Sequence, residues 1–118
     1  MFEKNLEMGY LLDFYGDVLP ERRRDIMDLY YNDDLSLAEI AEQMGITRQA
    51  VRDCIKKTEA ELSFYEEKLG LRRRLTEAER HAKRAREAAT EAGDLLPPRL
   101  REALLCELEA LSAAVSVE

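Results

Sequence analysis

One stretch of 21 residues constrains this chain more than any other. Residues 37–57 read LAEIAEQMGITRQAVRDCIKK. Ala41 is small enough for two helices to cross there, and Gly45, four residues later, suits the left-handed residue of a tight turn. The positions that lock a second helix onto the first are also apolar: Ile40, Met44, Ile46, Val51 and Cys54 or Ile55. The pattern predicts a helix-turn-helix whose second helix follows Thr47 as its N-cap.

The second helix of such a motif offers its outward residues to the major groove of a nucleic acid. Arg can bind guanine, Gln can bind adenine, and Lys and Thr can hold phosphates. The candidate nucleic-acid-binding residues are Thr47, Arg48, Gln49, Arg52, Lys56 and Lys57. Asp53 lies among them and repels phosphate, so an ordinary solvated helix face is the alternative interpretation.

The rest of the chain predicts helices and no strand. The expected segments run from about Leu6 to Asp17 with Asn5 as N-cap, from Pro20 to the Asn32–Asp34 turn, and through the motif. Ser36 and Glu39 form a capping box before the third segment. The fourth carries a heptad-like apolar stripe up to Gly70, where the helix breaks or kinks. That stripe consists of Val51, Ile55, Thr58, Leu62, Tyr65 and Leu69.

We therefore expect a helix-turn-helix domain over residues 1–70 and a helical C-terminal extension over 71–118. The extension comprises an arm over 71–92, a linker over 93–98 and a helix over 99–116. The arm has a thin apolar stripe, which favours an exposed helix. It also holds the densest basic cluster, Arg72, Arg73, Arg74, Arg80, Lys83, Arg84 and Arg86. That cluster is either a solvated face or a phosphate-tracking surface.

Charge and composition limit the class of function. The net charge is −7, which argues against broad nonspecific nucleic-acid binding, although residues 71–92 carry seven basic and four acidic side chains. One His and two separated Cys give no metal site, and no catalytic or phosphate-loop motif is present, so we expect no enzyme, cofactor, metal or small-molecule substrate. No apolar run is long enough to insert into a membrane, and we expect a cytoplasmic protein.

Two resemblances extend this interpretation. Residues 20–62 resemble region 4 of bacterial sigma factors, which implies a three- or four-helix core like that of the winged-helix superfamily. Residues 3–70 resemble the YlxM family through strings such as LLDFY at 11–15, DLYYNDDLSL at 28–37 and TRQAVRD at 47–53. This family consists of small proteins encoded beside the signal recognition particle GTPase. The resemblance implies an accessory or regulatory role in that pathway, with its RNA or its GTPase as partner.

Three functions remain open from the sequence: an accessory protein of that pathway, a DNA-binding transcription regulator of sigma region 4 type, or an interaction module that keeps the motif as a scaffold. The last helix also has an apolar face through Leu100, Leu104, Leu108 and Leu111. A soluble chain must cover such a face, so we expect a homodimer with this helix at or near the interface.

Overall fold

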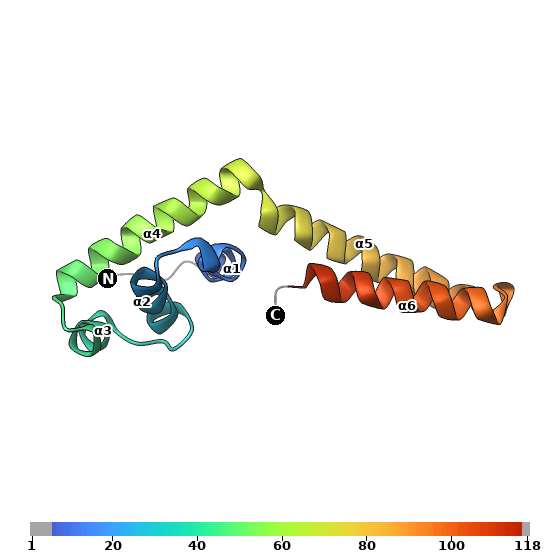
Figure 1. Cartoon of the computed structure of the whole chain (residues 1–118), viewed down its shortest axis with the longest axis horizontal. Helices are drawn as coiled ribbons and strands as arrows, with labels where there is room; N and C mark the ends of the chain where they lie inside the picture. Colours follow the sequence, from blue (N-terminus) through green and yellow to red (C-terminus); the bar gives the residue numbers. More distant parts are fainter. Residues whose placement is uncertain (1–5, 117–118) are drawn as a thin grey trace. The chain divides into compact units, whose positions relative to one another are not determined.

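The computed structural model describes residues 6–116, in which α-helices and short 3₁₀ turns follow one another without a strand (Figure 1). The elements are α1 (Leu6–Tyr15), η1 (Gly16–Val18), α2 (Glu21–Tyr31), α3 (Leu37–Met44), α4 (Arg48–Leu69), α5 (Leu71–Ala92), η2 (Gly93–Leu95) and α6 (Pro98–Val115). The all-α prediction is confirmed. The chain divides into two compact units, residues 1–70 and residues 71–118.

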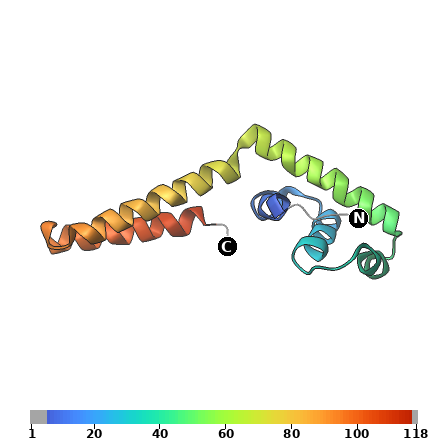
Figure 2. The same ribbon diagram turned by 180° about the vertical axis from the view of Figure 1, so that it is seen from behind.

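Helix α4 is the common support of the first unit. Its residues Val51, Ile55, Thr58 and Leu62 are all 0% exposed. Helices α1, α2 and α3 each pack against α4, and α1 and α2 lie on the same side of it in both views (Figures 1 and 2). The predicted stripe ends earlier than expected, because Tyr65 is only half-buried and Leu69 is 56% exposed.

The helix ends follow local sequence signals. The capping box is confirmed, since the Glu39 backbone N–H donates to Ser36 Oγ at 3.1 Å and the Ser36 N–H donates to Glu39 Oε1 at 2.9 Å. These bonds hold the pKa of Glu39 below its ordinary value. Gly70 ends α4 with a φ of +59°, as the sequence predicted. Glycine reaches this left-handed conformation without the steric cost that a side chain brings.

Two predicted details of the first helices differ from the structure. Helix α1 ends at Tyr15, and the chain continues as the turn η1 instead of reaching Asp17 as a helix. Helix α2 begins at Glu21 with Pro20 as its cap. The predicted cap Asn5 lies outside the described residues.

In the second unit, α5 and α6 form a helical hairpin joined by η2, and the two helices run side by side in both views (Figures 1 and 2). Ala82 and Ala89 are buried in this contact. Across it, Arg86 Nη1 donates to Ser112 Oγ at 2.9 Å. The arm predicted over 71–92 is the helix α5, which is exposed at most of its positions. It packs on α6 through its alanines, because such small side chains let two helices approach closely.

Within residues 6–116, no helix combines the length and the apolar character that crossing a membrane requires.

We predict that Gly45→Ala lowers the free energy of unfolding by about 1–2 kcal/mol, because φ at Gly45 is +72° and a Cβ there strains the backbone. A Cβ at this position would meet no atom within 4 Å, so strain is the only cost. The matched control is Gly9→Ala inside α1, where the space is equally open. That change should add about 0.5–1 kcal/mol in urea unfolding. Equal effects at the two glycines would contradict the turn geometry.

We also predict opposite effects for the same change at two threonines. Thr58 Oγ1 is buried without a hydrogen-bond partner, so Thr58→Val should raise the free energy of unfolding by about 1 kcal/mol. Thr47 Oγ1 accepts the Ala50 N–H at 3.0 Å, so Thr47→Val should lower it by about 1 kcal/mol. Thermal or urea unfolding of both variants checks the pair, and a destabilised Thr58→Val would show that its hydroxyl is satisfied.

Candidate nucleic-acid interface

The turn between α3 and α4 is built by the residues that the motif requires. Ala41 is buried, and its carbonyl accepts the backbone N–H groups of Gly45 and, at 3.0 Å, of Ile46. These bonds satisfy the end of α3 and turn the chain back within three residues. Thr47 then caps α4, as the sequence predicted.

All six candidate residues on α4 and its cap are exposed. They do not form one uniform surface. At the helical rotation of about 100° per residue, Arg48, Arg52 and Lys56 form one line, because they lie four residues apart. Lys57 lies beyond Asp53 on the other flank of the exposed face. The structure thus gathers three of the four basic residues into a line.

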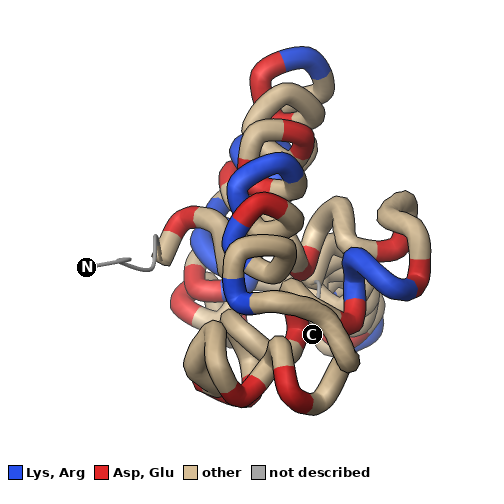
Figure 3. The backbone as a smooth tube through the Cα atoms, turned by 90° about the vertical axis from the view of Figure 1, so that its left-hand side faces the viewer, with Lys and Arg blue, Asp and Glu red and all other residues tan. Residues whose placement is uncertain are grey.

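Gln49 and Asp53 are joined to each other. Gln49 Nε2 donates to Asp53 Oδ1 at 2.8 Å, which engages one amide proton and one carboxylate oxygen. The basic positions of α4 are interspersed with acidic ones along the helix (Figure 3). The exposed N-terminal half of α4 can therefore hold a few phosphates and contact base edges, but it does not offer a wide basic surface.

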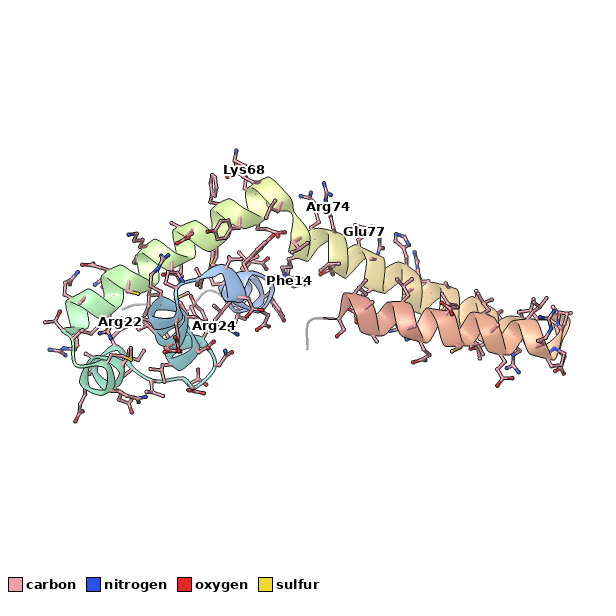
Figure 4. All side chains as sticks on the ribbon, viewed as in Figure 1. Phe14, Arg22, Arg24, Lys68, Arg74 and Glu77 are labelled. Carbon is pink, nitrogen blue, oxygen red and sulfur yellow. The ribbon has the colours of Figure 1, made fainter. Side chains whose placement is uncertain are left out.

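The arginines of α2 add a contact that the sequence did not predict. Arg22 (labelled in Figure 4) donates from Nη2 to the Met44 carbonyl at 3.3 Å, at the C-terminal end of α3. A positive charge is favourable at that end, where unpaired carbonyls concentrate negative partial charge. Arg22 thereby lies beside the turn that leads into α4. The local signal was only a run of three arginines, which does not reveal distant partners.

Carboxylates on the second half of α4 accept hydrogen bonds from side chains of α1, α2 and α4. Glu61 accepts from Arg23 Nη1 at 2.6 Å and from the Tyr65 hydroxyl at 2.7 Å. Glu66 accepts from the Tyr15 hydroxyl at 2.7 Å, and Glu59 accepts from the Tyr31 hydroxyl. Each of these acceptors holds a residue of α1, α2 or α4 itself. The contacts fix how α4 is placed on the rest of its unit.

The predicted basic cluster is distributed around α5. Arg72 and Arg86 are half-buried, and the other five members are exposed. Arg86 is engaged with Ser112, and Arg80 pairs with Glu77 at 2.5 Å. At about 100° per residue the seven side chains point in different directions and form no single stripe. Among the described residues, no group of three or more His, Cys, Asp or Glu is placed to hold a metal ion.

Comparison with known proteins identifies the family. Residues 2–94 match the family model described as "Putative helix-turn-helix protein, YlxM / p13 like" (UPF0122). The chain belongs to this family. Relatives named UPF0122 protein occur in Bacillus cereus (strain AH187), Bacillus anthracis (strain A0248) and Bacillus thuringiensis subsp. konkukian (strain 97-27). Each is 54% identical over 80 residues, which cover 68% of this chain and 73% of the relative.

The family match confirms the resemblance to YlxM proteins and corrects its extent. The resemblance placed from the sequence covered residues 3–70, whereas the match continues to residue 94. Helix α5 and its basic residues therefore belong to the matched region. Helix α6 lies beyond the matched residues.

The bonds at Glu61 predict a pH dependence of stability. The hydrogen bonds from Arg23 and then Tyr65 hold the pKa of Glu61 below its ordinary value of 4.5. A lowered folded-state pKa stabilises the fold above about pH 4.5, and that stabilisation is lost as the pH falls through the lowered pKa. Glu61→Gln should therefore unfold more easily than the parent at pH 7, and the difference should narrow towards pH 3.

The measurement is the urea unfolding free energy of both proteins between pH 3 and pH 7. Glu67→Gln, which removes an exposed carboxylate from the same helix, controls for the loss of one charge. A difference between Glu61→Gln and the parent that stays constant with pH would contradict the prediction.

Proposed function

We propose that this protein is a non-enzymatic helix-turn-helix accessory protein that binds nucleic acid through the first half of α4. One observation carries the proposal: Arg48, Arg52 and Lys56 form an exposed line on a helix whose adjacent side is fully buried in the core. A helix held in this way offers its charged side to a groove without any rearrangement of the core.

The resemblance to YlxM proteins supports a regulatory role in the signal recognition particle pathway. Its RNA and its GTPase are the proposed partners. The moderate charge of the α4 face fits this role, because an accessory protein that binds together with a second macromolecule needs only part of the binding energy from its own phosphate contacts. A homodimer belongs to the proposal, since two copies carry two α4 helices for paired sites.

A DNA-binding transcription regulator of sigma region 4 type is the second candidate. The observation that favours it is the presence of Arg48 and Gln49 at the start of α4. These are the side-chain types that recognise guanine and adenine in the major groove. A pull-down with the full chain from total RNA and fragmented genomic DNA, with sequencing of what binds and identification of bound proteins, separates the candidates. Enrichment of the particle's RNA or GTPase favours the accessory role in the signal recognition particle pathway. Recovery of DNA fragments that share one duplex sequence favours the transcription regulator.

We predict that Arg48→Ala/Arg52→Ala weakens nucleic-acid binding while the fold is retained, because both side chains are exposed. Each lost contact costs about 1–3 kcal/mol, so affinity should fall at least tenfold. The measurement is fluorescence anisotropy at low salt with the nucleic acid recovered in the pull-down.

The matched control is Lys68→Ala/Arg99→Ala, which removes the same charge from exposed positions outside the α4 face. Its affinity should stay within a few-fold of the parent. Equal losses in the two double variants would show that only net charge matters, and an unchanged Arg48→Ala/Arg52→Ala would exclude α4 as the binding surface.

A further inference from the structure

Helix α6 is apolar on more of its surface than α5 covers. None of its 18 residues is buried. Leu105, Leu108 and Val115 are half-buried, as expected for the side that faces α5. A second set of leucines remains uncovered: Leu100 is 49% exposed, Leu104 43% and Leu111 45%. This second set lies within about 40° of helix rotation.

Helix α5 has a matching second set, made of small residues. Ala82 and Ala89 face α6, whereas Ala85 and Ala88 are exposed. On both helices the exposed apolar residues are rotated by about 80° about the helix axis from the residues that face the other helix. The rotation has the same direction in α5 and α6. Because α5 and α6 run antiparallel, equal rotations turn towards the same side of the hairpin. The exposed leucines of α6 and the exposed alanines of α5 therefore share one face, which we name the apolar face of the hairpin.

The opposite side of the hairpin carries charged side chains. It holds an open groove of about 520 Å³ whose lining is mostly charged or hydroxylated: Arg86, Glu87, Thr90, Glu91, Leu105 and Glu109. A pair of helices with one charged side and one apolar side has the pattern of half a helical bundle. The two-helix unit thus has a surface to bury and no helix of its own left to bury it.

We propose that the apolar face binds a second copy of this chain, so that two α5–α6 hairpins form a four-helix bundle. Size complementarity favours this occupant. The α5 part of the face carries Ala85 and Ala88 beside Arg74 and His81, whereas the α6 part carries leucines beside Glu107. A two-fold axis parallel to the helices sets each α6 against the α5 of the other copy and lets leucines pack onto alanines.

The size of the face fits the same conclusion. An 18-residue helix is about 27 Å long, and two helices span about 20 Å, so the flat area is on the order of 500 Å². Interdigitating side chains bury more accessible area than the flat value, and stable complexes bury about 800 Å² per partner. A contact through α6 alone would offer about half the flat area, so the proposal includes α5. The contact between the two hairpins supplies the interface for the homodimer of the proposed function. Formation of this interface does not require nucleic-acid binding.

Sedimentation velocity of the full chain at tens of micromolar, without nucleic acid, tests the proposal. The parent should have about twice the chain mass of 13.6 kDa. Leu104→Glu/Leu111→Glu should raise the dimer dissociation constant at least about 100-fold, because it places charges in the apolar contact. Ala88→Glu should have the same effect from α5. The matched control is Ala113→Glu, on the polar side of α6, and it should stay dimeric.

Circular dichroism shows whether each variant keeps its helices. If the glutamate variants lose them, Leu104→Ala/Leu111→Ala preserves helix propensity and should still weaken the dimer at least about tenfold. A monomeric parent overturns the proposal, as do variants of the face that remain as dimeric as Ala113→Glu. Dissociation by Leu104→Glu/Leu111→Glu without dissociation by Ala88→Glu would overturn the four-helix arrangement. Since nucleic acid is absent, none of these results depends on the α4 interface.

Discussion

Burial of one side of α4 is the constraint on which the first unit depends. Val51, Ile55 and Leu62 have no exposed surface, and α1, α2 and α3 all pack on this helix. A helix is rigid in rotation, so fixing its buried side also fixes which residues face outward. The exposed line of Arg48, Arg52 and Lys56 is thus a consequence of core packing. The packing that forms the core therefore also determines which charged residues of α4 face outward.

Some acidic residues of the chain accept hydrogen bonds that hold the first unit together. Glu59, Glu61 and Glu66 accept hydrogen bonds from Tyr31, Arg23 and Tyr15, respectively, and these contacts lie on the second half of α4. The first half of the same helix carries the basic line. The net charge of the chain therefore does not predict the local charge of this surface. A chain with a net charge of −7 can still present a basic line where its carboxylates lie elsewhere.

Sequence predicted those features that depend on neighbours within one helical turn. The capping box at Ser36, the left-handed Gly45 and the end of α4 at Gly70 all follow from local hydrogen bonds and backbone sterics. The pairs Tyr15–Glu66 and Arg23–Glu61 join residues 51 and 38 positions apart, and nothing in the local pattern indicates them. The alanine stripe of α5 predicts little buried area, yet its small side chains permit the close approach by which α5 packs on α6.

The two units satisfy the same hydrophobic requirement in different ways. In the first unit, four different helices contribute side chains to one core, and Val51, Ile55 and Leu62 of α4 are fully buried in it. In the second, α5 and α6 meet along one line, and only the small Ala82 and Ala89 become buried. Two helices cannot enclose a core, since each covers only one side of the other. The leucines at 100, 104 and 111 are positioned like core residues of a bundle with more than two helices. By this criterion the first unit encloses its own core, whereas the hairpin leaves part of its apolar surface exposed.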